Sequence, residues 1–274
     1  MKSRVPLRKL IWYDLRVGTK VNIYRYLFAT VILVFISELV LLLAHDNHLS
    51  LQLWDLFYQI FEGLPEYTKE RESQFQLPVL LMMFQLFMLF TIGSYPKQDI
   101  CGYGRNVFLE SGSRKRWWGS KCVWLCVNIM VYYVLAIFIL AICLWVQGSP
   151  VSFKVTDSMT FQQVGKNTVS FFGNLLLLPL LVSETMGILQ LFIGVFLRPI
   201  WGYGVSIALL VISAYKVNPL LIGNYFMMAR NRYFSLDGKL SMTEGSIVCL
   251  ILFLGIMILG SWMMGRYDIL NKGD

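Results

Sequence analysis

Long apolar runs constrain this chain more than any other feature of its sequence. A helix needs about 20 mainly apolar residues to cross the hydrocarbon core of a bilayer. Six runs approach that length, at residues 24–44, 77–95, 122–146, 174–197, 200–217 and 246–265. Of the 274 residues, 57% are hydrophobic and 15% are charged, which excludes an ordinary soluble domain. The sequence therefore predicts an all-α polytopic membrane protein with six transmembrane helices, in a single domain over residues 1–274.

The polar N-terminal stretch before the first run has helical periodicity. Over residues 5–22, the apolar side chains Leu7, Leu10, Ile11, Leu15, Val17 and Val21 share one arc, and Arg8, Lys9, Arg16 and Lys20 share the opposite one. We expect residues 1–23 to hold an amphipathic helix on the inner membrane surface. Asp14 falls inside the apolar arc, where it either pairs with a neighbouring Arg or contacts a partner protein.

The distribution of basic residues predicts the orientation. Cytoplasmic loops carry an excess of Lys and Arg. With the N-terminus inside, sixteen Lys and Arg lie on the cytoplasmic side and eight on the outer side. We therefore predict that both termini are cytoplasmic, with residues 266–274 as a cytoplasmic tail.

The polar stretch 99–121 between the second and third runs has the composition of a structured cytoplasmic loop. Gly102 and Gly104 permit a tight turn, residues 105–110 have the pattern of a short helix, and Ser111-Gly112-Ser113 ends it. Ser113 is a candidate cap for the helix that enters the bilayer next. A loop with this much local order is expected to bind something.

Two outer segments are apolar but too short to span. Residues 53–61 lie in the acidic outer loop 45–76, and we expect them to form a helix on the outer leaflet. Residues 218–229 begin with Asn-Pro, precede the last run, and have the pattern of a re-entrant or interfacial segment.

Four polar residues within the predicted spans are candidates for a substrate path: Glu38, Asn128, Glu184 and Gln190. An ionisable group in the bilayer is energetically costly and is a functional-site hypothesis by default. Each of them either lines a path or holds neighbouring helices together by hydrogen bonds.

The sequence lacks motifs for catalysis, nucleotide binding or metal binding. It has no H-E-x-x-H, G-x-S-x-G or G-x-x-x-x-G-K-[ST] pattern, so we predict neither an enzyme nor a nucleotide site in this chain. We interpret His45 and His48 as solvated and Cys122 and Cys126 as buried thiols, and we predict no metal site. The net charge of +8 lies at the ends of the apolar runs and forms no basic stripe, which favours contact with lipid over nucleic acid.

Together these features resemble the membrane subunit, or permease, of type-2 ATP-binding-cassette exporters. The likeness lies in the N-terminal surface helix, the loop 99–121, the segment 218–229 and the C-terminal residues 266–270. Within the loop it rests on Asp99, Gly102, Gly104, the apolar residues 107–109, Ser113-Arg114 and the ending Gly119-Ser120-Lys121. This chain has Asp99 where family members often have Glu, and its residues 114–118 are more basic and aromatic than usual. Similar compact permeases from Gram-positive bacteria export antimicrobial peptides or confer immunity to them.

The resemblance implies a bacterial plasma-membrane transporter built from two permeases, identical or related, and two separate ATPase subunits that bind ATP and Mg. Residues 1–23 would be the elbow helix, and residues 105–110 would be a coupling helix docked in a cleft of the ATPase. The implied coupling residues are Asp99, Arg105, Val107, Phe108, Leu109, Glu110 and Arg114.

Three alternatives to these readings remain open. Phe108 and Leu109 could dip into the inner leaflet without touching an ATPase. The protein could be a non-transporting membrane sensor or immunity protein that binds an antimicrobial ligand at its outer face, through residues 53–61 and 218–229. It could also be an intramembrane enzyme, in which case changing Glu38 or Glu184 would abolish activity of the isolated chain.

Overall fold

The computed structural model describes residues 6–46, 52–66, 77–102, 113–148, 151, 168–236 and 238–266. The helices are α1 (Leu7–Val21), α2 (Ile23–Asp46), α3 (Leu53–Phe61), α4 (Val79–Ile92), α5 (Tyr95–Cys101), α7 (Arg114–Val146), α8 (Thr168–Phe172), the π-helix η1 (Gly173–Leu177), α9 (Leu178–Phe196), α10 (Pro199–Tyr215), the 3₁₀ helices η2 (Ile222–Phe226) and η3 (Met228–Arg230), and α11 (Met242–Arg266). These ranges contain no β-strand, only an isolated bridge between Asn231 and Leu240. The predicted all-α class is confirmed.

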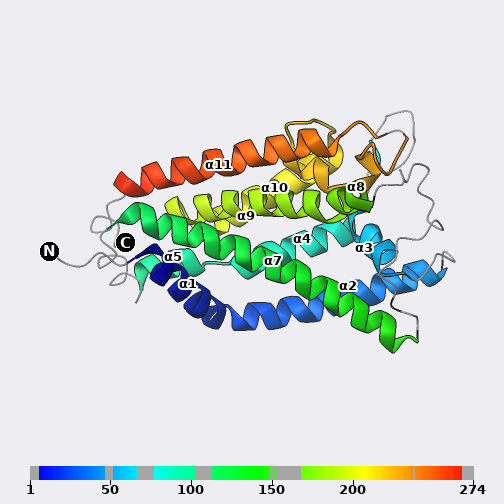
Figure 1. Cartoon of the computed structure of the whole chain (residues 1–274), viewed down its shortest axis with the longest axis horizontal. Coiled ribbons are helices and arrows are strands. Elements are labelled where there is room, and N and C mark those ends of the chain that lie inside the picture. Colours follow the sequence, from blue (N-terminus) through cyan, green and yellow to red (C-terminus); the bar gives the residue numbers. More distant parts are fainter. Residues whose placement is uncertain are drawn as a thin grey trace.

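The helices form an elongated bundle (Figure 1). Helices α1 and α5 lie at one end, on the left of the figure, and α3 and α8 lie at the other. We call these the α1 end and the α3 end. The buried hydrophobic side chains of the bundle form one core that includes residues of the long helices and of α3, η2 and η3.

Five helical stretches are long and apolar enough to cross a membrane. Within the described part of the chain they are Ile23–Leu43, Val79–Ile100, Arg114–Val146, Val169–Phe196 and Met242–Arg266. They correspond to five of the six predicted runs. The remaining run, at 200–217, corresponds to α10, a shorter apolar helix of 17 residues.

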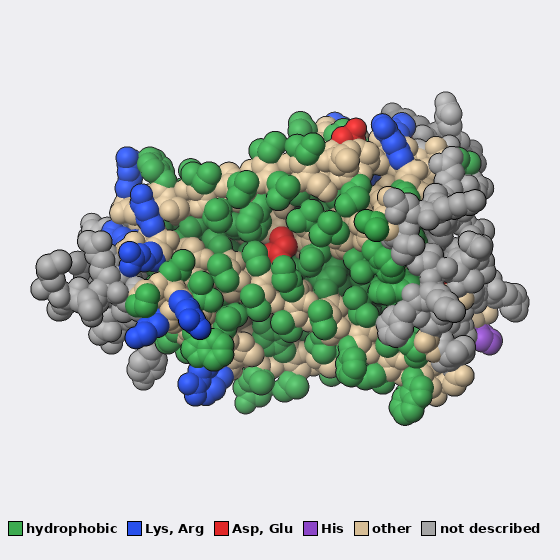
Figure 2. Space-filling model, viewed as in Figure 1, with side chains coloured by type: hydrophobic (Ala, Val, Ile, Leu, Met, Phe, Trp, Pro, Cys, Tyr) green, Lys and Arg blue, Asp and Glu red, His purple; other side chains and the backbone are tan. Residues whose placement is uncertain are grey.

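The outer surface of the bundle is apolar along most of its length. Figure 2 shows hydrophobic side chains over the middle of the visible face and a group of Lys and Arg at the α1 end. Helices α2 and α11 contribute many exposed apolar side chains, among them Phe35, Leu42, Ile251, Ile258 and Trp262. A surface of this kind is stable against lipid and not against water. The protein is therefore membrane-embedded.

Helix α7 begins eight residues earlier than the predicted run at 122–146. Trp117, Lys121, Leu125 and Asn128 are all buried, and their spacing places them on one face of a helix. The helix begins at Arg114, directly after Ser113, as the predicted cap position requires, and the buried face extends over this first part of the helix. Ser113 occupies the predicted cap position, but its side chain makes no capping hydrogen bond.

Helix α3 forms where the sequence predicts a helix, but it does not lie on the outer leaflet. Seven of its nine residues are buried. The ring of Phe61 packs against those of Phe84 and Phe226, at 5.0 and 6.4 Å between ring centroids. The prediction of a surface helix was wrong because α3 is apolar on most of its circumference, so the protein interior covers it on more than one side.

The segment after α10 folds back onto the bundle as η2 and η3. Ile222, Tyr225 and Phe226 are buried, and the predicted short apolar segment at 218–229 therefore packs against protein. It joins α10 to α11 at the α3 end (Figure 1).

Candidate functional site

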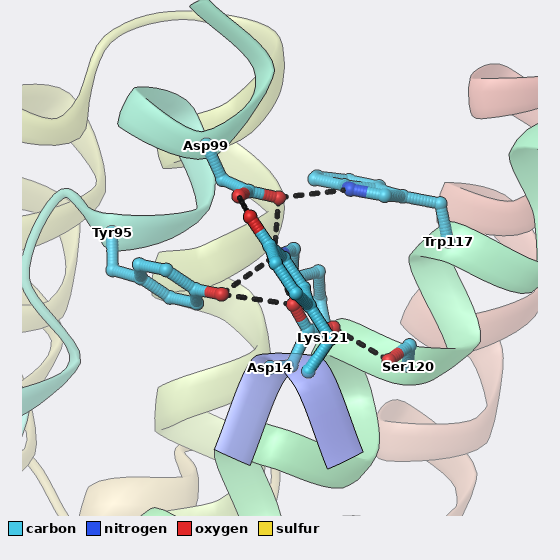
Figure 3. A network of polar contacts seen from close by, with 7 residues as sticks. Asp14, Tyr95, Asp99, Trp117, Ser120 and Lys121 are labelled. Carbon is cyan, nitrogen blue, oxygen red and sulfur yellow. Dashed lines mark hydrogen bonds and ion pairs between the residues drawn. The ribbon is translucent and has the colours of Figure 1, made fainter. Parts of the chain in front are cut away.

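A buried ionic cluster joins three helices at the α1 end (Figure 3). The ammonium Nζ of Lys121, from α7, lies 2.6 Å from Oδ1 of Asp14 in α1 and 2.6 Å from Oδ2 of Asp99 in α5. Lys121 is fully buried, and Asp14 and Asp99 are 2% and 6% exposed. One lysine thus bridges two carboxylates that are far apart in the sequence.

Neutral donors complete the coordination of both carboxylates. Asp14 accepts hydrogen bonds from the hydroxyl of Tyr95 at 2.8 Å and from Oγ of Ser120 at 2.5 Å. Asp99 accepts one from Nε1 of Trp117 at 3.1 Å. These bonds matter because two carboxylates and one ammonium leave an excess negative charge, which buried donors stabilise.

Aromatic rings enclose the lysine. Its Nζ lies 4.3 Å from the ring centroid of Tyr95 and 4.9 Å from that of Trp117. The hydroxyl of Tyr13 lies 3.5 Å from Oδ1 of Asp99. Burial, and then the charge of Asp99, raise the pKa of Tyr13, so this hydroxyl keeps its proton at neutral pH. The three charged side chains are buried, and both carboxylates bond to the same lysine.

Helix α1 fits closely against this site. Gly18 is buried against Trp124 and Tyr95, and a Cβ at this position would overlap the indole of Trp124. Leu10, Asp14 and Gly18, four residues apart, form the buried stripe of α1. Because this stripe faces α7, Asp14 is paired with Lys121 of α7. It is not paired with a neighbouring Arg of α1.

No family model, curated protein or solved structure matches this chain. The assignment of a function therefore depends on the residues and their geometry.

Of the seven predicted coupling residues, two fall within the described part of the chain. Asp99 belongs to the ionic cluster. Arg114 is exposed at the first turn of α7. The other five, Arg105, Val107, Phe108, Leu109 and Glu110, lie outside the described residues, as do all residues of the predicted tail 266–274 except Arg266, which ends α11.

Three of the four predicted path residues bond to neighbouring helices. Asn128 accepts a hydrogen bond from Tyr26 and donates one to Thr91 at 2.9 Å, which joins α7 to α2 and α4. Gln190 donates to the carbonyl of Leu89 at 2.9 Å. Glu38 accepts from Nε2 of Gln147 at 3.3 Å, near the α3 end. These contacts favour the helix-packing interpretation for all three residues.

Glu184 differs from those three. It is 7% exposed, and neither carboxyl oxygen has a nitrogen or oxygen partner among the described residues. The polar group beside it is the thiol of Cys126. The structure does not bring Glu184 together with Glu38, Asn128 and Gln190 into one hydrogen-bonded site.

Sequence reasoning missed the role of Lys121, which it counted as a cytoplasmic loop charge. A signal was available in the spacing of Trp117, Lys121, Leu125 and Asn128, which places Lys121 on a largely apolar helix face. The carboxylate of Asp14 in an apolar arc was a second signal. Neither signal by itself pairs the two residues, because they are 107 positions apart.

Proposed function

We propose that this chain is the membrane-spanning subunit of an ATP-binding-cassette exporter of the type-2 permease kind, which moves a hydrophobic or peptide-like substrate outward. A separate ATPase would dock on the loop at 99–121. The ionic cluster is the observation that supports this most directly. In the sequence, Asp99 precedes residues 103–112 and Lys121 follows them. Lys121 forms ion pairs with both Asp99 and Asp14 of α1. A force applied to the loop would therefore reach α1, α5 and α7 together.

The proposed topology has six spans. Five are the long apolar stretches, and α10 is the other. At 1.5 Å per residue its 17 residues extend about 25 Å, near the lower limit for a spanning helix. Six crossings place α1 and the end of α11 on one side, which we propose is the cytoplasmic side of a bacterial plasma membrane. The segment 218–229 would then be re-entrant from the outer face.

The proposed division of labour assigns nucleotide chemistry to the partner. The ATPase subunits would bind ATP and Mg, and closure of the ATPase pair would push the loop and tilt the attached helices. A second permease, identical or related, would complete the substrate path, and lipid would cover the apolar belt. We propose no catalytic residue, metal site or nucleic-acid contact in this chain.

The test is reconstitution with the companion ATPase in lipid vesicles. The double change Phe108→Ala with Leu109→Ala should lower the ATPase stimulation by this chain at least about tenfold, because a docked apolar helix concentrates binding energy in such residues. The exposed Lys9→Met is the matched control and should leave stimulation unchanged. Unchanged stimulation in the double variant would exclude docking through these residues. Full function without any ATPase would favour the sensor interpretation.

A further inference from the structure

Glu184 is an exception among the deeply buried charged residues of the described chain. Asp14 and Asp99 share the ammonium of Lys121 in the ionic cluster. Arg230 donates five hydrogen bonds, and Asp55 also has an interaction partner. Glu184 alone of these has two buried carboxyl oxygens without a nitrogen or oxygen partner. Its polar neighbour is the thiol of Cys126, so it is the one buried charged residue of this set that has neither a charged nor a nitrogen or oxygen partner.

The position of Glu184 is close to the middle of the membrane. It lies within two residues of the centre of the span Val169–Phe196. Possible donors nearby are engaged elsewhere: Ser183 exchanges hydrogen bonds with Gln85, and the hydroxyl of Tyr133 lies 2.7 Å from Oγ of Ser183. The structure places no Lys or Arg of the described residues beside Glu184.

The apolar environment determines which protonation state of the Glu184 carboxyl is favoured in this conformation. An ionised carboxylate with no charged partner, and with only a thiol as its polar neighbour, costs several kcal/mol in an apolar interior. Burial therefore favours the neutral, protonated form of this carboxyl. A positive group that takes the place of that proton would stabilise the ionised form.

We propose that Glu184 is the mid-membrane binding site for an amphiphilic monovalent cation, an alkylammonium head group on an apolar tail. This inference rests on the proposed export function and names its substrate class. On binding, the Glu184 carboxyl releases its proton to water, and the ammonium forms an ion pair with the resulting carboxylate, so that the charge of the site is conserved. A fixed counter-charge halfway across the bilayer lowers the cost of moving a cation through it.

Access to the site requires a movement of the helices. Both carboxyl oxygens are shielded in this conformation. Cys126 of α7, beside the carboxyl, is half-buried, and Thr185 contacts the carbonyl of Cys249 in α11 at 3.3 Å. Separation of α9 from α7 or α11 would expose the carboxyl to the apolar surface of the bundle. The tail of the ligand would then lie along apolar side chains of these helices.

The binding experiment uses the full chain in lipid nanodiscs without any ATPase. The probes are dodecylammonium and, as the uncharged match, dodecanol. The wild type should bind dodecylammonium at least about tenfold more tightly than dodecanol, the strength expected for a charge-assisted hydrogen bond. Glu184→Gln should remove that difference, whereas Glu38→Gln, which changes a carboxyl with its own partner, should keep it.

A chemical readout on the wild type covers the case in which Glu184→Gln does not fold. Dicyclohexylcarbodiimide reacts with protonated carboxyls in apolar surroundings, and mass spectrometry locates the adduct. Dodecylammonium should protect Glu184 from this reaction and dodecanol should not. Equal protection by both compounds, or none by either, would overturn the proposal and leave Glu184 as a carboxyl that only holds a proton.

The binding and labelling experiments on Glu184 do not depend on docking of the ATPase. A wild type that stimulates the ATPase but binds dodecylammonium no more tightly than dodecanol would refute the substrate class alone. Loss of stimulation in the double variant at Phe108 and Leu109, or its absence in the wild type, concerns only the proposed export function.

Discussion

At the scale of single residues, two buried cations of this protein are stabilised in different ways. Lys121 is held by two carboxylates. Arg230, the last residue of η3, donates to the carbonyls of Leu64, Ser213 and Ala214 at 2.6–2.8 Å. Burial lowers its pKa to about 10, which leaves it charged at neutral pH. The carbonyls of Ser213 and Ala214 end α10, where the helix dipole favours a cation.

We expect Lys121→Met to destabilise the protein by about 3–5 kcal/mol, because the change leaves Asp14 and Asp99 buried without a counter-charge. Thermal unfolding in detergent measures the effect. The exposed Lys9→Met is the control and should be close to neutral. The triple variant Asp14→Asn, Asp99→Asn, Lys121→Met should recover part of the loss. Equal melting temperatures for Lys121→Met and wild type would contradict the pairing described here.

At the scale of elements, glycines set how α1 and the joint between α4 and α5 pack. Gly93, at φ +54°, follows α4. The guanidinium of Arg25 occupies the space where its Cβ would be, and Arg25 donates to Asn22 and Ser94 at 3.1 Å. The helix break at Gly93 thus leaves room for the guanidinium of Arg25. The chain turns at this break into α5, the helix that contains Asp99.

Gly93→Ala should be more destabilising than Gly148→Ala. Both glycines have positive φ, where alanine costs about 1–2 kcal/mol, but a Cβ at Gly148 meets no atom within 4 Å. In Gly93→Ala only, displacement of Arg25 should add about 1–3 kcal/mol to the loss of stability. Melting curves of the two variants give the comparison. Equal losses would mean that Arg25 moves aside without cost.

Gly18→Ala should loosen the contact of α1 with α7, because the new methyl group overlaps Trp124. Overpacking of this kind costs about 1–3 kcal/mol. Gly204→Ala in α10 is the matched control, since a Cβ there meets no atom within 4 Å. It should be neutral or stabilising by up to about 1 kcal/mol. The rate of limited proteolysis within α1 measures the effect: Gly18→Ala should be cleaved there faster than the wild type, and Gly204→Ala should not.

At the scale of the whole molecule, the apolar belt and the basic α1 end set how the bundle sits in a bilayer. Exposed apolar side chains cover α2 and α11, and exposed Arg8, Lys9, Arg16 and Lys20 lie on α1. An excess of basic residues favours the cytoplasmic side, so the α1 end is expected to face inward.

Single cysteines in a cysteine-free background test that orientation. Thr19 in α1, Arg198 between α9 and α10, and Lys216 after α10 are exposed. A membrane-impermeant maleimide added to intact cells should label Lys216→Cys and spare Thr19→Cys and Arg198→Cys. All three should react after the membrane is opened. Labelling of Thr19→Cys from outside would reverse the orientation and remove the proposed ATPase site from the cytoplasm.

The sequence by itself determined the helical class and the places of the long apolar helices, because span length and composition are local properties that the bilayer imposes on each segment. It also determined that α1 is amphipathic, since its period is read along a single helix. It predicted the helix at 53–61 but not its burial, because periodicity does not show what covers a face.

Only the tertiary structure decided how the buried polar groups are partnered. Asp14, Asp99 and Lys121 come from three helices, and their pairing depends on how those helices pack, which no local pattern encodes. The same packing gave Asn128 and Gln190 nitrogen or oxygen partners and placed only the thiol of Cys126 beside Glu184. The difference arises because a buried charge is stabilised by whatever lies across the helix interface, and that neighbour is distant in sequence.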